Sequence, residues 1–304
     1  MSPVLTRRHA VLLVVGVLAV SFSAVLIRLA EDRETPNLAI AFYRCAMAAA
    51  VLIPFALVRH RDELRDLTTR QRRLALLSGL FLAAHFASWI PSLSYTTVAA
   101  SSVLVTTQPL WVAMFGRLIG EPPSRRALAG IGIALAGTLV IAGGGLGGSG
   151  RALIGDALAI AGAIFGAGYV LSGRNLRREI SLFPYTAVVY GTAAAILAGV
   201  LAVSGTPFAG YEPKVWLLFA LMTIGPQFLG HTVFNYLLGH LEASVVAVAI
   251  MAEPVGATLL ALAILGEAPS VSAVAGGALV LAGVYVAIAT VARRDAAVLD
   301  SPVE

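Results

Sequence analysis

Long apolar stretches separated by short polar ones occupy almost the whole chain. The stretches lie near residues 10–29, 38–58, 74–94, 98–119, 127–143, 154–173, 182–203, 214–238, 243–265 and 271–292. A helix needs about 20 apolar residues to cross a bilayer. The pattern therefore predicts an all-α integral membrane protein with ten transmembrane helices, here called spans 1 to 10.

Composition agrees with a membrane protein and excludes other classes. The chain is 59% hydrophobic and 12% charged, whereas a globular domain carries roughly 25% charged residues. Its basic residues lie in short loops rather than in one basic domain, which excludes a nucleic-acid partner. The single cysteine, Cys45, excludes a disulfide framework and a multi-cysteine metal site. We expect no metal and no cofactor, and we interpret span 1 as uncleaved.

The distribution of lysine and arginine predicts the orientation. With the N-terminus in the cytoplasm, sixteen of these residues lie inside, four lie outside, and Arg44 lies within span 2, which accounts for all 21. Because positive charges stay on the cytoplasmic side, both termini are predicted to be cytoplasmic. The basic segment 59–73 becomes a cytoplasmic connection that either contacts anionic lipid headgroups or is a solvated linker.

An internal repeat divides the chain into two halves. The segment GEPPSRRALAGIGIALAG from Gly120 and the segment GEAPSVSAVAGGALVLAG from Gly266 share ten of eighteen positions. Upstream, Gln108-Pro109 aligns with Glu253-Pro254. Each half holds five spans, an odd number, so the second copy starts on the opposite side of the membrane. Inverted repeats of this kind build many secondary transporters.

The repeat sets the predicted domain boundaries. They are a first repeat at 1–143, a linker at 144–153, a second repeat at 154–292 and a cytoplasmic tail at 293–304. The glycine-rich linker formally matches G-x-G-x-x-G, but it follows a membrane span rather than a strand, so a flexible linker is favoured. Small residues in spans 5, 6 and 10 indicate close helix packing within the chain; a homodimer is the alternative to a monomer.

A proline in spans 4 and 9, followed by G-E-x-P-S at the start of spans 5 and 10, resembles the EamA family of the drug/metabolite transporter superfamily. The resemblance covers roughly residues 10 to 292. It implies a solute exporter of the bacterial inner membrane that works by alternating access. Members of the superfamily move amino acids, metabolites, drugs and nucleotide sugars, and the similarity is greatest to an amino-acid exporter.

Polar and aromatic residues at membrane depth are the candidate substrate-binding residues. Buried polar groups in hydrocarbon are costly, so they face either a cavity or a hydrogen-bond partner on another helix. Gln227, His231 and Asn235 recur at i, i+4 and i+8 and are predicted to share one helix face. The full set is His85, Trp89, Gln108, Tyr169, Gln227, His231, Asn235 and Met251.

Three further residues carry predictions about mechanism. Glu253 is the only carboxylate deep in a span; it either binds and releases a proton during transport or caps the carbonyls freed by Pro254. Pro109 and Pro254 are predicted to kink spans 4 and 9, as a gating hinge or for packing alone. Arg44 is interpreted as structural, reaching the interface or pairing with an acid of the first outer loop.

Enzyme signatures are absent from the sequence. It contains no H-E-x-x-H, no P-loop and no G-x-S-x-G motif, so we expect neither an enzyme nor ATP hydrolysis by this chain. The predicted function is export of small amphipathic metabolites, above all amino acids including aromatic and hydrophobic ones. The alternatives are a broad drug and metabolite efflux carrier and a membrane-embedded enzyme. The expected partners are a small-molecule substrate and the lipid bilayer.

Overall fold

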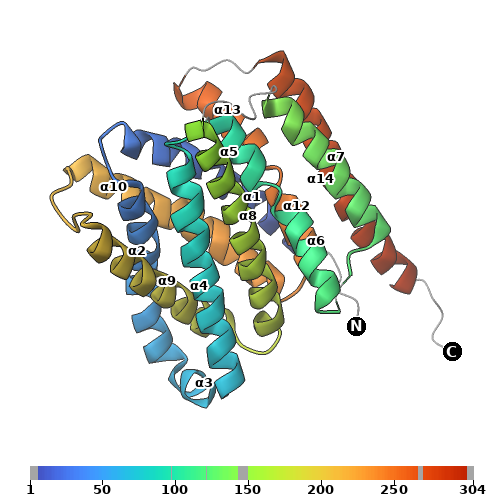
Figure 1. Ribbon diagram of the computed structural model, residues 1–304. Coiled ribbons are helices and arrows are strands. Elements are labelled where there is room, and N and C mark those ends of the chain that lie inside the picture. The colour runs from blue at the N-terminus through green and yellow to red at the C-terminus, as the bar shows by residue number, and fades with distance from the viewer. Residues whose placement is uncertain (1–5, 97, 121, 143–149, 266–269, 300–304) are drawn as a thin grey trace.

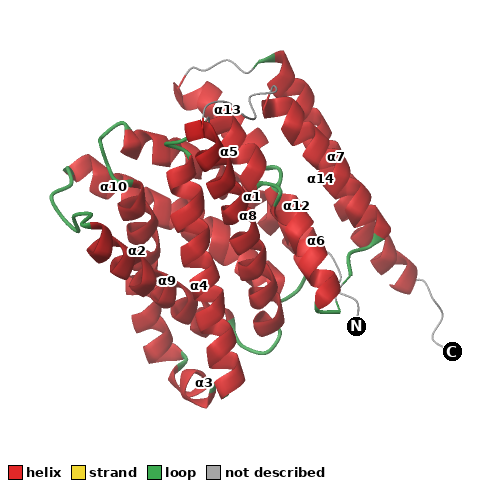
Figure 2. Ribbon diagram, in the orientation of Figure 1, coloured by secondary structure: helices red, strands yellow, loops and turns green. Residues whose placement is uncertain are grey.

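The protein is a bundle of helices, arranged as Figure 1 shows. The computed structural model describes residues 6–96, 98–120, 122–142, 150–265 and 270–299, and every regular element in these ranges is helical (Figure 2). The elements are α1 (Arg7–Glu31), α2 (Asn37–Arg59), α3 (Arg61–Asp66), α4 (Thr69–Ser92), α5 (Val98–Val105), α6 (Gln108–Leu118), α7 (Arg125–Ala142), α8 (Gly150–Arg177), α9 (Leu182–Ser204), α10 (Pro213–Met222), η1 (Thr223–Thr232), α11 (Val233–Leu238), α12 (Ala243–Ile250), α13 (Glu253–Leu265) and α14 (Val271–Leu299).

Each predicted span coincides with one helix or with consecutive helices. Seven helical runs in the described residues are long and apolar enough to cross a membrane: 7–31, 37–59, 69–92, 150–177, 182–204, 213–238 and 243–264. The all-helical membrane fold is therefore confirmed, while the count of ten stays a prediction. Helix α8 begins at Gly150, within the predicted linker, and α14 continues to Leu299, past the predicted end of span 10. Glu121, Glu267 and residues 143–149 lie outside the described ranges.

Spans 4 and 9 are broken at the same place. Helix α5 ends at Val105 and α6 begins at Gln108, while α12 ends at Ile250 and α13 begins at Glu253. The proline is the second residue of the new helix in both cases, where its missing N–H would have had no partner within the helix. The sequence predicted a kink here, and the structure shows two separate helices instead.

Span 8 contains a π-helix that the sequence analysis did not predict. The ten residues of η1 lie between α10 and α11, and Pro226 is among them. Proline lacks the N–H of a regular helical bond, so the ladder is interrupted here. The hydroxyl of Thr232 donates to the carbonyl oxygen of Gln227, five residues earlier, at 3.0 Å. This bond satisfies a carbonyl within the wider π-helical turn, and such turns are frequent at functional sites.

The two halves of the chain pack through reciprocal contacts. Helix α4 of the first half packs on α8 of the second, and the equivalent elements of the opposite halves, η1 and α1, also pack on each other. The same holds for α6 on α8 and α13 on α1. Helices α2 and α9 pair directly, as do α7 and α14, which lie together at one edge of the bundle (Figure 1). The packing therefore follows the internal repeat.

Glycines let α7 and α14 approach closely. A Cβ atom on Gly130 would lie 2.6 Å from the carbonyl oxygen of Gly283, and one on Gly137 would lie 2.6 Å from that of Gly276. Since the residue numbers increase along one helix as they decrease along the other, the two helices are antiparallel. The glycine faces that prompted the homodimer alternative are thus occupied within one chain.

Polar contacts join the helix ends on the two sides of the bundle. On the arginine-rich side, Arg70 and Glu179 form an ion pair at 2.7 Å, and the backbone N–H of Ser181 donates to Glu63 at 2.6 Å. Burial acts to raise the pKa of Glu63, but the hydrogen bonds from Ser181, together with the charge and hydrogen bond of His60, outweigh it and lower that pKa from its ordinary value. On the other side, Arg33 pairs with Glu212 at 3.2 Å.

Candidate functional site

A cavity of about 50 Å³ lies between the two halves. Its walls come from spans 1, 3 and 4 of the first half and spans 6, 8 and 9 of the second. The lining residues are Val20, Ser23, His85, Trp89, Val105, Thr106, Gln108, Pro109, Gly166, Tyr169, Val170, His231, Phe234, Asn235, Leu238, Ala247, Ile250, Met251 and Glu253. The lining includes seven of the eight candidate substrate-binding residues from the sequence.

The breaks in spans 4 and 9 open onto this cavity. Gln108 and Glu253, the first residues of α6 and α13, both line it, and so do Val105 and Ile250, the last residues of α5 and α12. The first turn of a helix has backbone N–H groups without helical partners and carries a partial positive charge. Discontinuous helices of this kind place backbone groups at the substrate sites of secondary transporters.

His85 and Trp89 form one polar and aromatic wall on α4. The His85 Nδ1 lies 2.8 Å from the carbonyl oxygen of Gly162. A carbonyl only accepts, so Nδ1 carries the hydrogen and Nε2 is an acceptor in the neutral ring. The His85 ring stacks on Trp89 at 5.9 Å between centroids. The indole Nε1 of Trp89 is buried and has no hydrogen-bond partner among the described residues, so it is available to a ligand acceptor.

Gly166 of α8 makes room for Gln108. A Cβ atom at this position would lie 2.7 Å from the Gln108 Oε1 and 3.1 Å from the His85 Nδ1. Gly162, one turn earlier, accommodates Trp89 in the same way, because a Cβ atom on Gly162 would lie 2.9 Å from the Cβ atom of Trp89. The G-x-x-x-G pair of span 6 therefore brings α4 and α6 close to α8 at the cavity, as the sequence analysis expected for packing within the chain.

His231 of η1 faces the α4 wall. Its ring centroid lies 6.5 Å from that of His85, 5.4 Å from Phe86 and 6.1 Å from Tyr169. The imidazole makes no hydrogen bond with the described residues. The two histidines thus come from equivalent spans of the two repeats and meet across the cavity.

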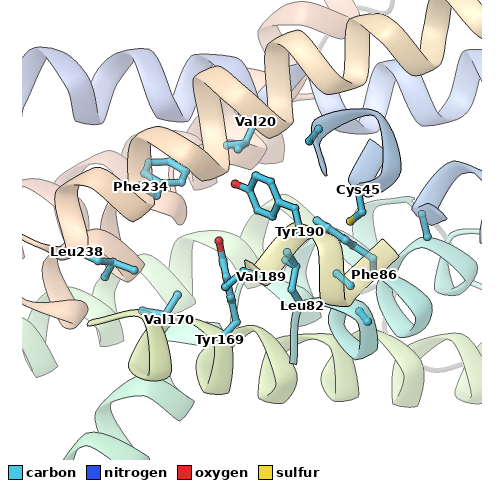
Figure 3. Close-up of a cluster of buried hydrophobic side chains, with 14 of the residues drawn as sticks. Val20, Cys45, Leu82, Phe86, Tyr169, Val170, Val189, Tyr190, Phe234 and Leu238 are labelled. Carbon is cyan, nitrogen blue, oxygen red and sulfur yellow. The ribbon is translucent and has the colours of Figure 1, made fainter. Parts of the chain in front are cut away.

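Asn235 and Tyr169 are joined by hydrogen bonds between spans 8 and 6. The Tyr169 hydroxyl donates to the Asn235 Oδ1 at 2.9 Å and accepts from the Asn235 Nδ2 at 2.7 Å. The Nδ2 also donates to the Tyr190 hydroxyl at 3.4 Å. Figure 3 shows both tyrosine hydroxyls pointing toward the segment that carries Phe234. The sequence offered two roles for such residues, facing a cavity or bonding to another helix, and Asn235 and Tyr169 do both.

Gln227 lies outside the cavity lining, although the sequence predicted that it shares a face with His231 and Asn235. The π-helix between these residues changes the number of residues per turn, so the i, i+4, i+8 spacing no longer aligns them. Gln227 is fully buried, and its Oε1 accepts a hydrogen bond from the Arg44 Nε at 3.1 Å.

Arg44 lies in the interior and not at the interface. Its side chain is 1% exposed. The Nη1 donates to the Ser23 Oγ at 3.3 Å, and the guanidinium carbon lies 4.0 Å from the centroid of the Phe86 ring. The expected pairing with an acid of the first outer loop does not occur. The only indication of this interior position in the sequence was a single arginine within an apolar span, and the sequence did not identify its hydrogen-bond acceptors.

Glu253 and its neighbours take different positions around the break in span 9. Met251 is fully buried and lines the cavity, while Pro254 is buried and is not among the lining residues. The Glu253 carboxylate makes no hydrogen bond or ion pair with the part of the chain that the structure describes. Only its backbone oxygen is bonded, accepting from the Ser21 Oγ at 3.2 Å. The carboxylate is thus free to face the cavity.

Comparison with known proteins identifies the family. The model of the EamA-like transporter family matches residues 7–143 and 153–289, which is most of the chain. The chain belongs to the EamA-like transporter family. The family model matches twice, once in each half, in agreement with the internal repeat. The family resemblance noted in the sequence is confirmed.

One curated protein and one solved structure are similar to this EamA-like chain. A protein of Archaeoglobus fulgidus named "Uncharacterized transporter" is 25% identical over 262 residues, 84% of this chain and 89% of that protein. One solved structure, titled "Crystal structure of protein", superposes with a TM-score of 0.77 at 23% identity over 97% of this chain and 99% of that one. The latter supports the fold alone. Together with the apolar helices, the comparisons indicate a multi-pass membrane transporter rather than an enzyme.

Proposed function

We propose that this EamA-like protein is an alternating-access exporter of small amphipathic metabolites, in particular amino acids with aromatic and hydrophobic side chains. It works in the bacterial inner membrane with ten spans and both termini in the cytoplasm. The observation that carries this proposal is one central cavity lined by both repeats, at the point where spans 4 and 9 break. Two opposed repeats around one site can rock against each other and expose it to either side.

The proposed topology has support from packing. Helices α7 and α14 occupy equivalent places in the repeat and run antiparallel, as an inverted repeat requires. The arginine-rich start of α1 lies beside the end of α11, where Arg8 covers the ring of Tyr236 at 5.4 Å. In Figure 1 this side of the bundle also carries α3 and the end of α14. An even number of crossings places both ends of the chain on one side.

The proposed substrates follow from the cavity wall. Trp89, Phe234 and Tyr169 supply aromatic surface, and the unpartnered Trp89 N–H and the Gln108 amide supply polar contacts. Apolar walls with a few placed polar groups suit amphipathic solutes. The resemblance of the sequence to the amino-acid exporter YddG supports amino acids. Broad drug and metabolite efflux is the alternative from the same class.

Proton coupling through Glu253 is a secondary proposal. Glu253 lines the cavity, and its carboxylate has no hydrogen-bonded partner among the described residues. A carboxyl group in such a place can exchange a proton during a transport cycle. The alternative is that Glu253 caps the carbonyls freed by Pro254. It has less support, because the Glu253 side chain bonds to none of the described carbonyls.

Transport assays in proteoliposomes test the main proposal. A panel of labelled amino acids is loaded inside or outside vesicles that contain the purified protein, together with one cationic dye and one neutral sugar. Accumulation of unmodified aromatic amino acids supports the proposal. Transport of the dye alone supports drug efflux, and a chemically altered product supports the membrane-embedded enzyme. Empty vesicles and vesicles with a heat-denatured protein are the controls.

A further inference from the structure

Two ionisable side chains, Arg44 and Glu253, lie deep in the bundle, and neither is bonded to an opposite charge among the described residues. The Arg44 guanidinium donates to two neutral acceptors, the Gln227 Oε1 at 3.1 Å and the Ser23 Oγ at 3.3 Å. The Glu253 carboxylate bonds to nothing within the described residues. Charges inside a membrane are costly unless they are paired or wet. The resting cavity thus leaves both charges only partly compensated.

Helix α1 connects the two groups. Ser23 of this helix lines the cavity and accepts from Arg44, and Ser21, two residues earlier, donates to the backbone oxygen of Glu253, which also lines the cavity. Arg44 and Glu253 are not among the ion pairs of the described residues. The Phe86 ring at 4.0 Å holds the guanidinium in place.

We propose that Arg44 is a specificity-determining residue whose guanidinium binds the carboxylate of the substrate while Glu253 binds its ammonium group. A zwitterionic head group carries both charges on adjacent atoms, so one ligand compensates both residues at once. This inference rests on the proposed transport function and assigns its substrate class as α-amino acids bound by the head group. The apolar side chain then extends into the cavity toward Trp89.

The route from the cavity to Arg44 passes Ser23. The Ser23 hydroxyl lines the cavity and is the acceptor that a substrate carboxylate replaces when it reaches the Arg44 Nη1. A hydrogen bond to a charged acceptor is stronger than one to a neutral hydroxyl. Guanidinium also binds carboxylate through two parallel bonds, which an ammonium cannot do. Arginine at this position therefore favours substrates that carry a carboxylate.

Binding of three matched ligands to the purified protein tests this inference. Phenylalanine carries both charges, 2-phenylethylamine lacks the carboxylate, and 3-phenylpropionate lacks the amine. We expect wild type to bind phenylalanine most tightly. In Arg44→Gln the affinity for phenylalanine falls by about tenfold or more, as loss of a charged hydrogen bond implies, while the affinity for 2-phenylethylamine changes little. Glu253→Gln has the opposite effect and weakens 2-phenylethylamine more than 3-phenylpropionate.

Further variants separate recognition from folding. Arg44→Lys keeps the charge, so it folds and retains part of the phenylalanine affinity. The double variant Arg44→Gln with Glu253→Gln removes both charges and avoids a single uncompensated one. Arg28→Gln, which removes an exposed arginine of α1 paired with Asp32 at 3.6 Å, is the matched control.

Defined outcomes overturn the inference. Equal loss of phenylalanine and 2-phenylethylamine binding in Arg44→Gln and Arg44→Lys shows a purely structural arginine. Equal binding of the three ligands by wild type shows that the head group is not recognised. If wild type binds phenylalanine in this pattern yet moves no amino acid across vesicles, the transport proposal fails while the assignment of Arg44 stands.

Discussion

Replacing Gly166 by alanine tests whether the close approach of three helices shapes the cavity. The added Cβ would lie 2.7 Å from the Gln108 Oε1 and 3.1 Å from the His85 Nδ1, whereas ordinary contacts begin at 3.4 Å. Gln108 must therefore move by about 0.7 Å and His85 by about 0.3 Å (3.4 minus 2.7 and 3.4 minus 3.1). The Gln108 side chain is flexible, but His85 is held by its 2.8 Å bond to Gly162.

The expected effect of Gly166→Ala is larger on transport than on stability. Overpacking a well-packed core lowers the free energy of unfolding by about 1–3 kcal/mol. Because the glutamine side chain can move, we expect a loss of about 1 kcal/mol for this substitution. Displacing the Gln108 amide from the cavity removes a polar contact, and crowding narrows the space. We expect the KM for phenylalanine in proteoliposomes to rise about tenfold, equivalent to about 1.4 kcal/mol of binding, with a small fall in Tm.

Gly199→Ala on α9 is the matched control, because a Cβ there meets nothing within 4 Å. In a helix interior this change stabilises by roughly 0.5–1 kcal/mol through chain entropy. Its KM is expected to equal that of wild type. The reasoning is refuted if Gly166→Ala keeps the wild-type KM, or if its transport falls only in proportion to the folded protein.

Four other changes have defined expectations. His231→Ala removes a ring from the cavity and should cut transport at near-normal expression, measured by uptake per folded molecule; a matching loss of folded protein would assign it to packing. Gly283→Val places a side chain against the backbone of α7 and should lower the free energy of unfolding by about 1–3 kcal/mol or more. The Tm in detergent should therefore fall markedly; an unchanged Tm would contradict the packing. Because the pKa of Glu63 is lowered in the folded state, its contribution is present above the ordinary carboxyl range and is lost as pH falls through the lowered value. Ser181→Ala should therefore weaken the dependence of Tm on pH below about 4.3, and an unaltered acid profile would exclude this role. Glu253→Gln should abolish any response of transport to an imposed pH gradient, and proton coupling is wrong if wild type ignores the gradient.

Much of the fold follows from the sequence, because helices in lipid must satisfy their backbone internally and so show as apolar runs. The repeat gave the division into halves, and the polar residues at membrane depth gave most of the cavity lining. Hydropathy does not report the phase of a helix, however. The π-helix in span 8 shifted that phase and removed Gln227 from the cavity.

The position of Arg44 could not be predicted for a different reason. Its depth in span 2 was compatible with reaching the interface, and only tertiary packing shows which neutral groups surround it. The acceptor Ser23 comes from the preceding helix α1 and Gln227 from the other half of the chain, and no local pattern connects them to Arg44. The prolines of spans 4 and 9 did mark the right positions, but periodicity alone does not distinguish a kink from two separate helices.

The glycine contacts between α7 and α14 have a consequence for how the chain was assembled. Gly130 and Gly276 are equivalent in the repeat, as are Gly137 and Gly283. In the structure Gly130 faces Gly283 and Gly137 faces Gly276, so exchanging the two repeats converts one contact into the other. Such crosswise matching is the signature of an isologous, two-fold interface. The covalent chain therefore contains, at this edge, the geometry of a homodimer of half-length subunits inserted in opposite directions.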